Sequence, residues 1–97
     1  MDKKSIVFMG TPKIAADVLQ ALLEAGISID LVVTQPDKKV GRKQTIVYSP
    51  VKELALQHNI EVFQPFRIKE DYQRILDVNP DLVVTCAYGQ IVPDQDS

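Results

Sequence analysis

The pattern of apolar and polar residues in the first third of the chain predicts a strand, a tight turn and a helix. Residues 5–9 form an almost continuous apolar run that stops at Gly10, which is typical of a parallel strand buried on both faces. Thr11 can cap the next helix, and Pro12 fits a first helical turn, where a missing N–H costs nothing. Gly26 then ends a stretch whose apolar residues recur with a helical period, namely Ile14, Val18, Leu19, Leu22 and Leu23.

The remainder of the chain continues to alternate between strands and helices. Three more strands are predicted at residues 29–34, 60–63 and 81–86, because β-branched side chains dominate them. Two more helices are predicted, at residues 50–59 and 69–78. The side chains expected to face the core from these helices are Val51, Leu54, Ala55, Tyr72, Ile75 and Leu76.

This alternation predicts an α/β fold, specifically a Rossmann-like parallel sheet with flanking helices and the strand order 3-2-1-4. We expect residues 1–97 to form one domain that is incomplete at its C-terminus, because the chain breaks off soon after the fourth strand.

Composition restricts the class of protein further. No apolar run approaches the roughly 20 residues that cross a bilayer, and the first residues do not form a secretion signal, so we expect a cytoplasmic location. The single cysteine, Cys86, excludes an internal disulfide, and with only one histidine, His58, we expect no metal centre. We interpret Cys86 as a core residue and His58 as a helix-end residue, neither of them catalytic.

A basic segment follows the second predicted strand. Between residues 34 and 52, five cations stand against Asp37 alone, a net charge of +4 in a chain whose total is −2. A cationic loop on an acidic body is suited to a polyanion, because only the loop is attracted to phosphates. A solvated surface loop without a ligand is the alternative interpretation.

The turn after the first strand invites comparison with dinucleotide-binding loops. Only Gly10 of the G-x-G-x-x-G pattern is present, because Pro12 and Ala15 occupy the other two glycine positions. A structural turn is therefore favoured over a pyrophosphate site, which argues against a dehydrogenase.

Short motifs are spread, in order, over nearly the whole chain. They are FMGTP at 8–12, TQPD at 34–37, GR at 41–42, SPVK at 49–52, VFQP at 62–65 and AYGQIVP at 87–93. Together they resemble the amino-terminal part of the methionyl-tRNA formyltransferase family. Each motif alone would be a weak signal, but their shared order and spacing make the resemblance specific.

The resemblance implies transfer of a formyl group from 10-formyltetrahydrofolate to the amine of initiator methionyl-tRNA, for translation initiation. It implies that the basic segment contacts the tRNA, with Arg42 as the central contact and with Gly41, Lys38, Lys39 and Lys43 beside it. Lys39 and Lys43 depart from the family, whose members often have proline and glycine there. These two departures keep or raise the positive charge.

The resemblance also implies that residues just past the fourth strand form one side of the folate pocket: Tyr88, Gly89, Gln90, Ile91 and Val92. Tyr88 and Ile91 would offer a flat apolar wall to the pterin ring, and the backbone of residues 90–92 would match its donors and acceptors. The carboxyl ends of strands near a switch point are where such sheets bind ligands. An ordinary buried connection is the alternative.

The family's catalytic asparagine, histidine and aspartate have no matching motif in residues 1–97, so we expect no catalytic residue here and no formyl transfer by this chain alone. The whole enzyme is expected to be a monomer. Two other functions remain open: another folate-dependent formyltransferase, acting on a sugar amine or glycinamide ribonucleotide, and a non-catalytic Rossmann-type binding module. The first of these does not need a long basic loop.

Overall fold

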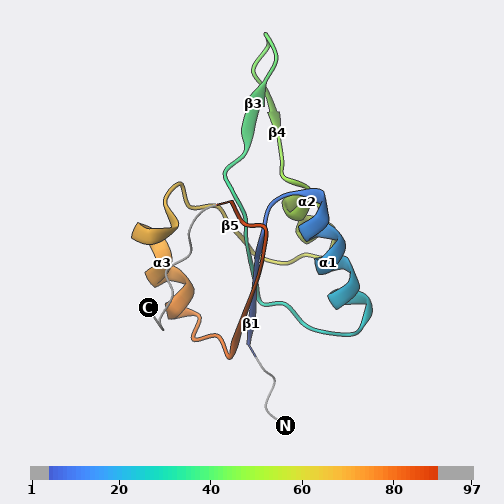
Figure 1. The fold of residues 1–97 in the computed structure, drawn as a ribbon, viewed down its shortest axis with the longest axis vertical. Helices are drawn as coiled ribbons and strands as arrows, with labels where there is room; N and C mark the ends of the chain where they lie inside the picture. The colour runs from blue at the N-terminus through green and yellow to red at the C-terminus, as the bar shows by residue number, and fades with distance from the viewer. Residues whose placement is uncertain (1–4, 90–97) are drawn as a thin grey trace.

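The computed structural model describes residues 5–89, and a four-stranded parallel sheet forms their central layer (Figure 1). Its strands are β1 (Ile6–Gly10), β2 (Leu31–Val33), β5 (Val62–Phe63) and β6 (Leu82–Cys86). They lie in the order β5-β2-β1-β6, and every neighbouring pair is parallel. The Rossmann-like parallel sheet expected from the sequence is therefore present.

The strand numbering differs from the predicted 3-2-1-4 for one reason. Two strands that the sequence analysis did not predict, β3 and β4, lie between β2 and β5 along the chain and form a separate sheet. When only the four strands of the parallel sheet are counted, they follow one another as 3-2-1-4.

Helices cover both faces of this sheet, as parallel strands require crossover connections. Helix α1 (Lys13–Glu24) and helix α2 (Pro50–Gln57) lie on one face, and α3 (Ile68–Asp77) lies on the other (Figure 1). Each begins and ends within a few residues of the predicted limits.

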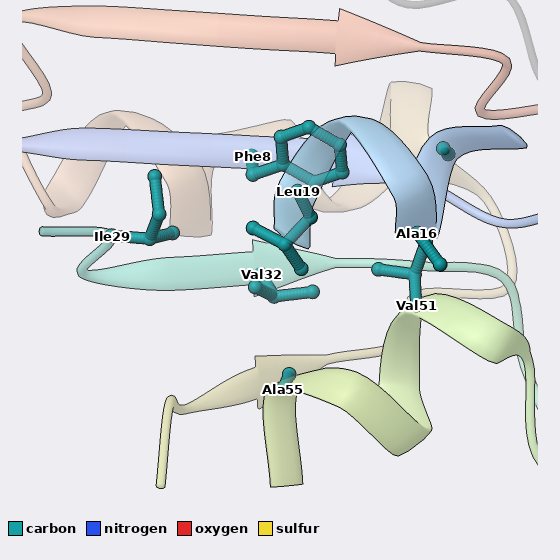
Figure 2. Packing of buried hydrophobic residues seen from close by; sticks show 8 residues of the cluster. Phe8, Ala16, Leu19, Ile29, Val32, Val51 and Ala55 are labelled. Carbon is teal, nitrogen blue, oxygen red and sulfur yellow. The ribbon is translucent and has the colours of Figure 1, made fainter. Parts of the chain in front are cut away.

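The alternation of side chains along the strands divides the core in two. On the face covered by α1 and α2, Phe8 and Val32 pack against these helices (Figure 2). On the opposite face, Val7 and Val33 pack with Ile75 of α3. All five side chains are fully buried, and each contributes roughly 1.5–3 kcal/mol relative to an exposed position.

The predicted inner faces of the helices need correction. In α1 the buried residues are Ala15, Ala16 and Leu19, whereas Ile14 is 64% exposed. Small side chains thus form the centre of the buried stripe, because α1 lies close to the sheet. Val18 at 36% and Leu76 at 39% are also exposed instead of buried.

The start of α1 also differs from the prediction. Pro12 is the N-terminal flanking residue, and no side chain caps the helix there. Thr11 lies one residue before this position, and its hydroxyl donates a hydrogen bond to the carbonyl of Tyr88.

The basic segment, expected to be a loop, forms an antiparallel hairpin. Strand β3 (Lys38–Val40) pairs with β4 (Thr45–Val47), and the hairpin projects from the end of the parallel sheet (Figure 1). The turn between them begins at Gly41, whose φ of 75° is a left-handed conformation that glycine adopts readily. All residues of both strands are exposed, so no buried apolar face marked them in the sequence.

Gly10 permits close packing where β1, α1 and β6 meet. A Cβ atom at this position would lie 2.6 Å from the Cβ of Ala15 and 2.7 Å from the carbonyl oxygen of Cys86. Both distances are too short for real contacts, and one neighbour is backbone, so the space cannot open cheaply. The interpretation of Gly10 as a structural residue agrees with this packing.

No helix among residues 5–89 is long and apolar enough to cross a membrane.

Gly10→Ala is expected to lower the free energy of unfolding of the chain by about 1–3 kcal/mol, the usual cost of overpacking. Urea denaturation followed by circular dichroism would measure it. Ala15→Gly and the double variant complete a mutant cycle, in which Ala15→Gly should recover part of the loss because it removes the nearest neighbour. If the two changes in unfolding free energy were strictly additive, the close contact between positions 10 and 15 would be contradicted.

Candidate functional site

A cavity of about 460 Å³ opens at the carboxyl ends of the central strands. Its walls come from three segments: Thr11 and Pro12 after β1, then Gln35, Pro36 and Lys38 after β2, and residues 87–89 after β6. This is the crevice at which open α/β sheets bind ligands. Tyr88 and Gly89, two of the residues expected beside the folate, belong to this cavity.

The Thr11 hydroxyl joins the ends of three strands. It donates a hydrogen bond to the Tyr88 carbonyl at 2.7 Å and accepts one from the Gln35 backbone N–H at 3.3 Å. The side-chain amide of Gln35 donates to the same Tyr88 carbonyl at 3.2 Å. One carbonyl after β6 is thus held by two donors, one after β1 and one after β2.

The Tyr88 ring does not line the cavity as a flat wall. Its side chain is only 2% exposed and packs in the core cluster beneath α3 with Met9, Leu31 and Ile68. Burial raises the pKa of the Tyr88 phenol to about 12, and the charge of Asp71 adds to the shift. The hydroxyl has no hydrogen-bond partner among the described residues. Tyr88 therefore anchors the turn by its ring, and its backbone carbonyl accepts the hydrogen bonds from Thr11 and Gln35.

The turn that follows β6 has an unusual backbone. Ala87 and Gly89 have φ values of 51° and 104°, both in the left-handed region. A Cβ atom at Gly89 would lie 2.9 Å from the side-chain nitrogen of Gln35, the atom that bonds to Tyr88. Glycine is favoured here by its backbone angle, and any larger side chain would also push the Gln35 amide away from Tyr88.

Asp37 fixes the base of the hairpin to the body of the protein. Both of its carboxylate oxygens accept hydrogen bonds from the Lys52 ammonium at 3.0 Å. The Gln64 amide donates to Asp37 at 2.7 Å and to the Gln35 carbonyl at 3.2 Å. The hydrogen bond from Gln64 and then the contacts with Lys52 lower the pKa of Asp37. We call Asp37, Lys52 and Gln64 the hairpin clamp.

The same region contains a second link between the hairpin and α2. Thr34 is fully buried, and its hydroxyl lies 2.7 Å from that of Ser49. Ser49 also caps α2, because its hydroxyl accepts a hydrogen bond from the Lys52 N–H at 3.0 Å. The Lys52 ammonium lies 3.8 Å from the centre of the Tyr48 ring. Both ends of the hairpin are thus attached to α2.

Four cations of the hairpin remain available to a ligand. Lys38, Lys39, Arg42 and Lys43 are exposed, and no carboxylate among residues 5–89 pairs with them. Lys52 differs because it belongs to the clamp. Lys38 also lines the cavity, so the cationic hairpin and the cavity share a border.

Seven of the residues predicted to contact tRNA or folate lie in the described part of the chain, around the hairpin and the cavity. Gly41 and the four cations share the hairpin, and Tyr88 and Gly89 border the cavity beside it. Gln90, Ile91 and Val92 lie outside the described residues.

Sequence analysis missed the polar residues that connect the two regions. Gln35 and Gln64 stand in the sequence only as letters of motifs, and Thr11 was expected to cap a helix. The motifs themselves were the available signal, because TQPD and VFQP each contain an amide side chain next to a proline that restricts the backbone.

The single cysteine and the single histidine of the chain lie outside the cavity and the hairpin. Cys86 is a free thiol, partly buried against the cluster around Phe8, and His58 lies at the C-terminal end of α2. In residues 5–89 there is no group of three or more His, Cys, Asp and Glu side chains that could hold a metal ion.

Acid is expected to release the hairpin clamp. The folded-state pKa of Asp37 lies below its ordinary value of 3.8, so the stabilisation is present above that value and is lost as the pH falls through the lower pKa. The backbone amide resonances of Lys38 and Lys39 should move in this range. Asp37→Asn should show the displaced resonances at neutral pH and no acid transition, whereas Asp17→Asn, which breaks the exposed pair with Lys13, should behave as the unaltered chain. Identical hairpin resonances in Asp37→Asn and the unaltered chain would contradict the clamp.

Comparison with known proteins agrees with the motifs. A sequence model described as formyl transferase matches residues 3–95. Three similar proteins are the methionyl-tRNA formyltransferases of Ligilactobacillus salivarius (52% identical over 91 residues), Mycoplasma capricolum (50% over 93) and Malacoplasma penetrans (53% over 91). These alignments cover 92%, 95% and 94% of the chain respectively, but only 29% of each relative. The chain thus spans less than a third of the length of these relatives. Since the match extends over nearly all of its residues, the chain belongs to the formyl transferase family.

Proposed function

We propose that this chain is the part of a methionyl-tRNA formyltransferase that positions both substrates. The single observation that carries the proposal is the shared border of a cationic hairpin and a cavity at the carboxyl ends of the sheet. The hairpin suits the phosphates of initiator methionyl-tRNA, and the cavity suits a flat ligand such as 10-formyltetrahydrofolate. Lys38 belongs to both regions, which would bring the two substrates close together.

In the proposed reaction, the amine of the esterified methionine attacks the formyl carbon of the folate. The bond from that carbon to the folate nitrogen breaks, and the formyl group passes to the amine. Residues of this chain would orient the two reactants, which contributes to the rate through proximity. The groups that move protons and stabilise the oxyanion would come from parts of the enzyme that this chain does not contain, so we propose that the chain alone does not catalyse transfer. The proposed setting is a monomeric enzyme in the cytoplasm.

The hairpin favours this function over the two alternatives. A formyltransferase for a sugar amine or glycinamide ribonucleotide has no need for four exposed cations on a projecting hairpin, since its substrate carries fewer charges than a tRNA. A binding module without chemistry would keep the cavity but gives no reason for the clamp that orients the hairpin beside it.

A chimeric enzyme provides the test. The segment of the L. salivarius enzyme that aligns with this chain is replaced by the chain itself, so that the host supplies the remaining length. We expect the chimera to formylate methionyl-tRNA with 10-formyltetrahydrofolate. A correctly folded chimera that binds neither substrate would overturn the proposed function.

Arg42 is expected to be the most important tRNA contact of this chain. In the chimera, Arg42→Lys keeps the charge but loses the planar guanidinium fork, and it should lower kcat/KM for tRNA by the equivalent of about 1–3 kcal/mol. Lys39→Ala should cost less and mainly reduce the dependence on salt, as for a single phosphate contact. Kinetics with each substrate varied separately would measure both effects. A silent Arg42→Lys, or a change confined to the KM for folate, would refute the assignment.

Gly89→Val is expected to raise the KM of the chimera for folate by at least about tenfold, the equivalent of roughly 1.4 kcal/mol, and to change the KM for tRNA less. The new side chain would displace the Gln35 amide and strain a backbone with positive φ. Gly26→Val is the matched control, because Gly26 also has positive φ but no neighbour within 4 Å of its added Cβ. An unchanged folate KM in a folded Gly89→Val chimera would count against this placement of the folate.

A further inference from the structure

Two groups of hydrogen bonds, one at the cavity and one at the hairpin, meet at Gln35. At the cavity, Thr11 and Gln35 hold the Tyr88 carbonyl at 2.7 and 3.2 Å. At the hairpin, Gln64 bonds to the Gln35 carbonyl and to Asp37, which is paired with Lys52. Gln35 takes part in both groups, its side chain in the first and its backbone carbonyl in the second.

The covalent path between the two groups is short and stiff. Only Pro36 separates Gln35 from Asp37, and its ring fixes one backbone angle. Proline also confines the residue before it to extended conformations, so Gln35 has little freedom to move independently of Asp37. A movement of Asp37 at the hairpin base should therefore move the Gln35 side chain as well.

The turn that receives this displacement needs external support. Ala87 and Gly89 both have positive φ, a conformation that is unfavourable for alanine because its Cβ comes too close to a carbonyl oxygen. The Tyr88 ring is buried on one side, and the Tyr88 carbonyl is held by two donors on the other. Loss of either donor leaves the direction of the carbonyl, and so the shape of the cavity wall, less well defined.

We propose that Thr11 and Gln35 are positioning residues that couple the cavity to the hairpin, so that each substrate binds more tightly when the other is present. This inference rests on the proposed function, in which the hairpin contacts tRNA and the cavity contacts folate. Contact with tRNA restrains the clamped hairpin base further and, through Gln35, the turn at residues 87–89. Folate then meets a wall that is already ordered, and by thermodynamic linkage the effect is reciprocal.

The experiment measures the dissociation constant of methionyl-tRNA from the chimera with and without saturating tetrahydrofolate, which lacks the formyl group and cannot react. The expected ratio of the two constants is about fivefold or more, the lower range of measured coupling. Thr11→Val, which removes the hydroxyl but keeps the shape, and Gln35→Met, which removes the amide, should bring the ratio to about one. Thr11→Ser should restore it, because the hydroxyl returns.

Gln73→Met is the matched control, because it also removes an amide hydrogen bond, but one made to Asp77 within α3. Its ratio should equal that of the unaltered chimera. A general loss of stability would lower both affinities in Thr11→Val and Thr11→Ser alike, whereas a positioning role separates these two variants. A ratio of one in the unaltered chimera, or a ratio unaffected by Thr11→Val and Gln35→Met, would overturn the coupling.

A second measurement keeps this inference separate from the proposed function. In the 97-residue chain without ligands, Asp37→Asn should shift the amide resonance of Gly89, and the same change on a Gln35→Met background should not. A chimera that binds neither substrate would end the proposed function, and the resonance of Gly89 would then decide whether the link through Gln35 exists. An unmoved Gly89 resonance in Asp37→Asn would end the positioning role in either case.

Discussion

The hydrogen bond from the Thr11 hydroxyl to the Tyr88 carbonyl is the contact on which the candidate site depends. Parallel strands end at one edge of a sheet, and the backbone groups that follow them lose their ladder partners there. A carbonyl in this position needs a donor, since unpaired polar groups are costly when water is excluded. Thr11 and Gln35 supply two donors to the same oxygen, and in doing so they bring the segments after β1, β2 and β6 together around the cavity.

The direction of the hairpin follows from a second constraint. Its strands bury no apolar face, so packing does not hold it, and the clamp at its base must do so. The side chains of Asp37 and Lys52 are only 29% and 14% exposed. Their ion pair is therefore better shielded from solvent than a pair on the open surface. The clamp removes one of the five cations of the basic segment from ligand binding. The other four remain exposed on the projecting strands and turn.

The family-like motifs acquire a common physical meaning in the structure. Residues from the FMGTP, TQPD, SPVK, VFQP and AYG segments meet within one hydrogen-bonded region, although they are far apart along the chain. The motifs therefore describe how the cavity and the hairpin are held together, in addition to the groups that would contact substrates.

The sequence by itself determined the parallel sheet, its three helices, the single-glycine turn and the basic character of residues 34–52. These features follow from local periodicity, turn residues and charge, which act over a few residues. Only the tertiary structure decided that Tyr88 turns its ring into the core, that Thr11 bonds across the sheet instead of capping α1, and that Lys52 pairs with Asp37. Each of these outcomes depends on contacts between residues 15 to 77 positions apart in the chain. Which contact forms depends on where the strands end in space, and no local sequence pattern encodes that position.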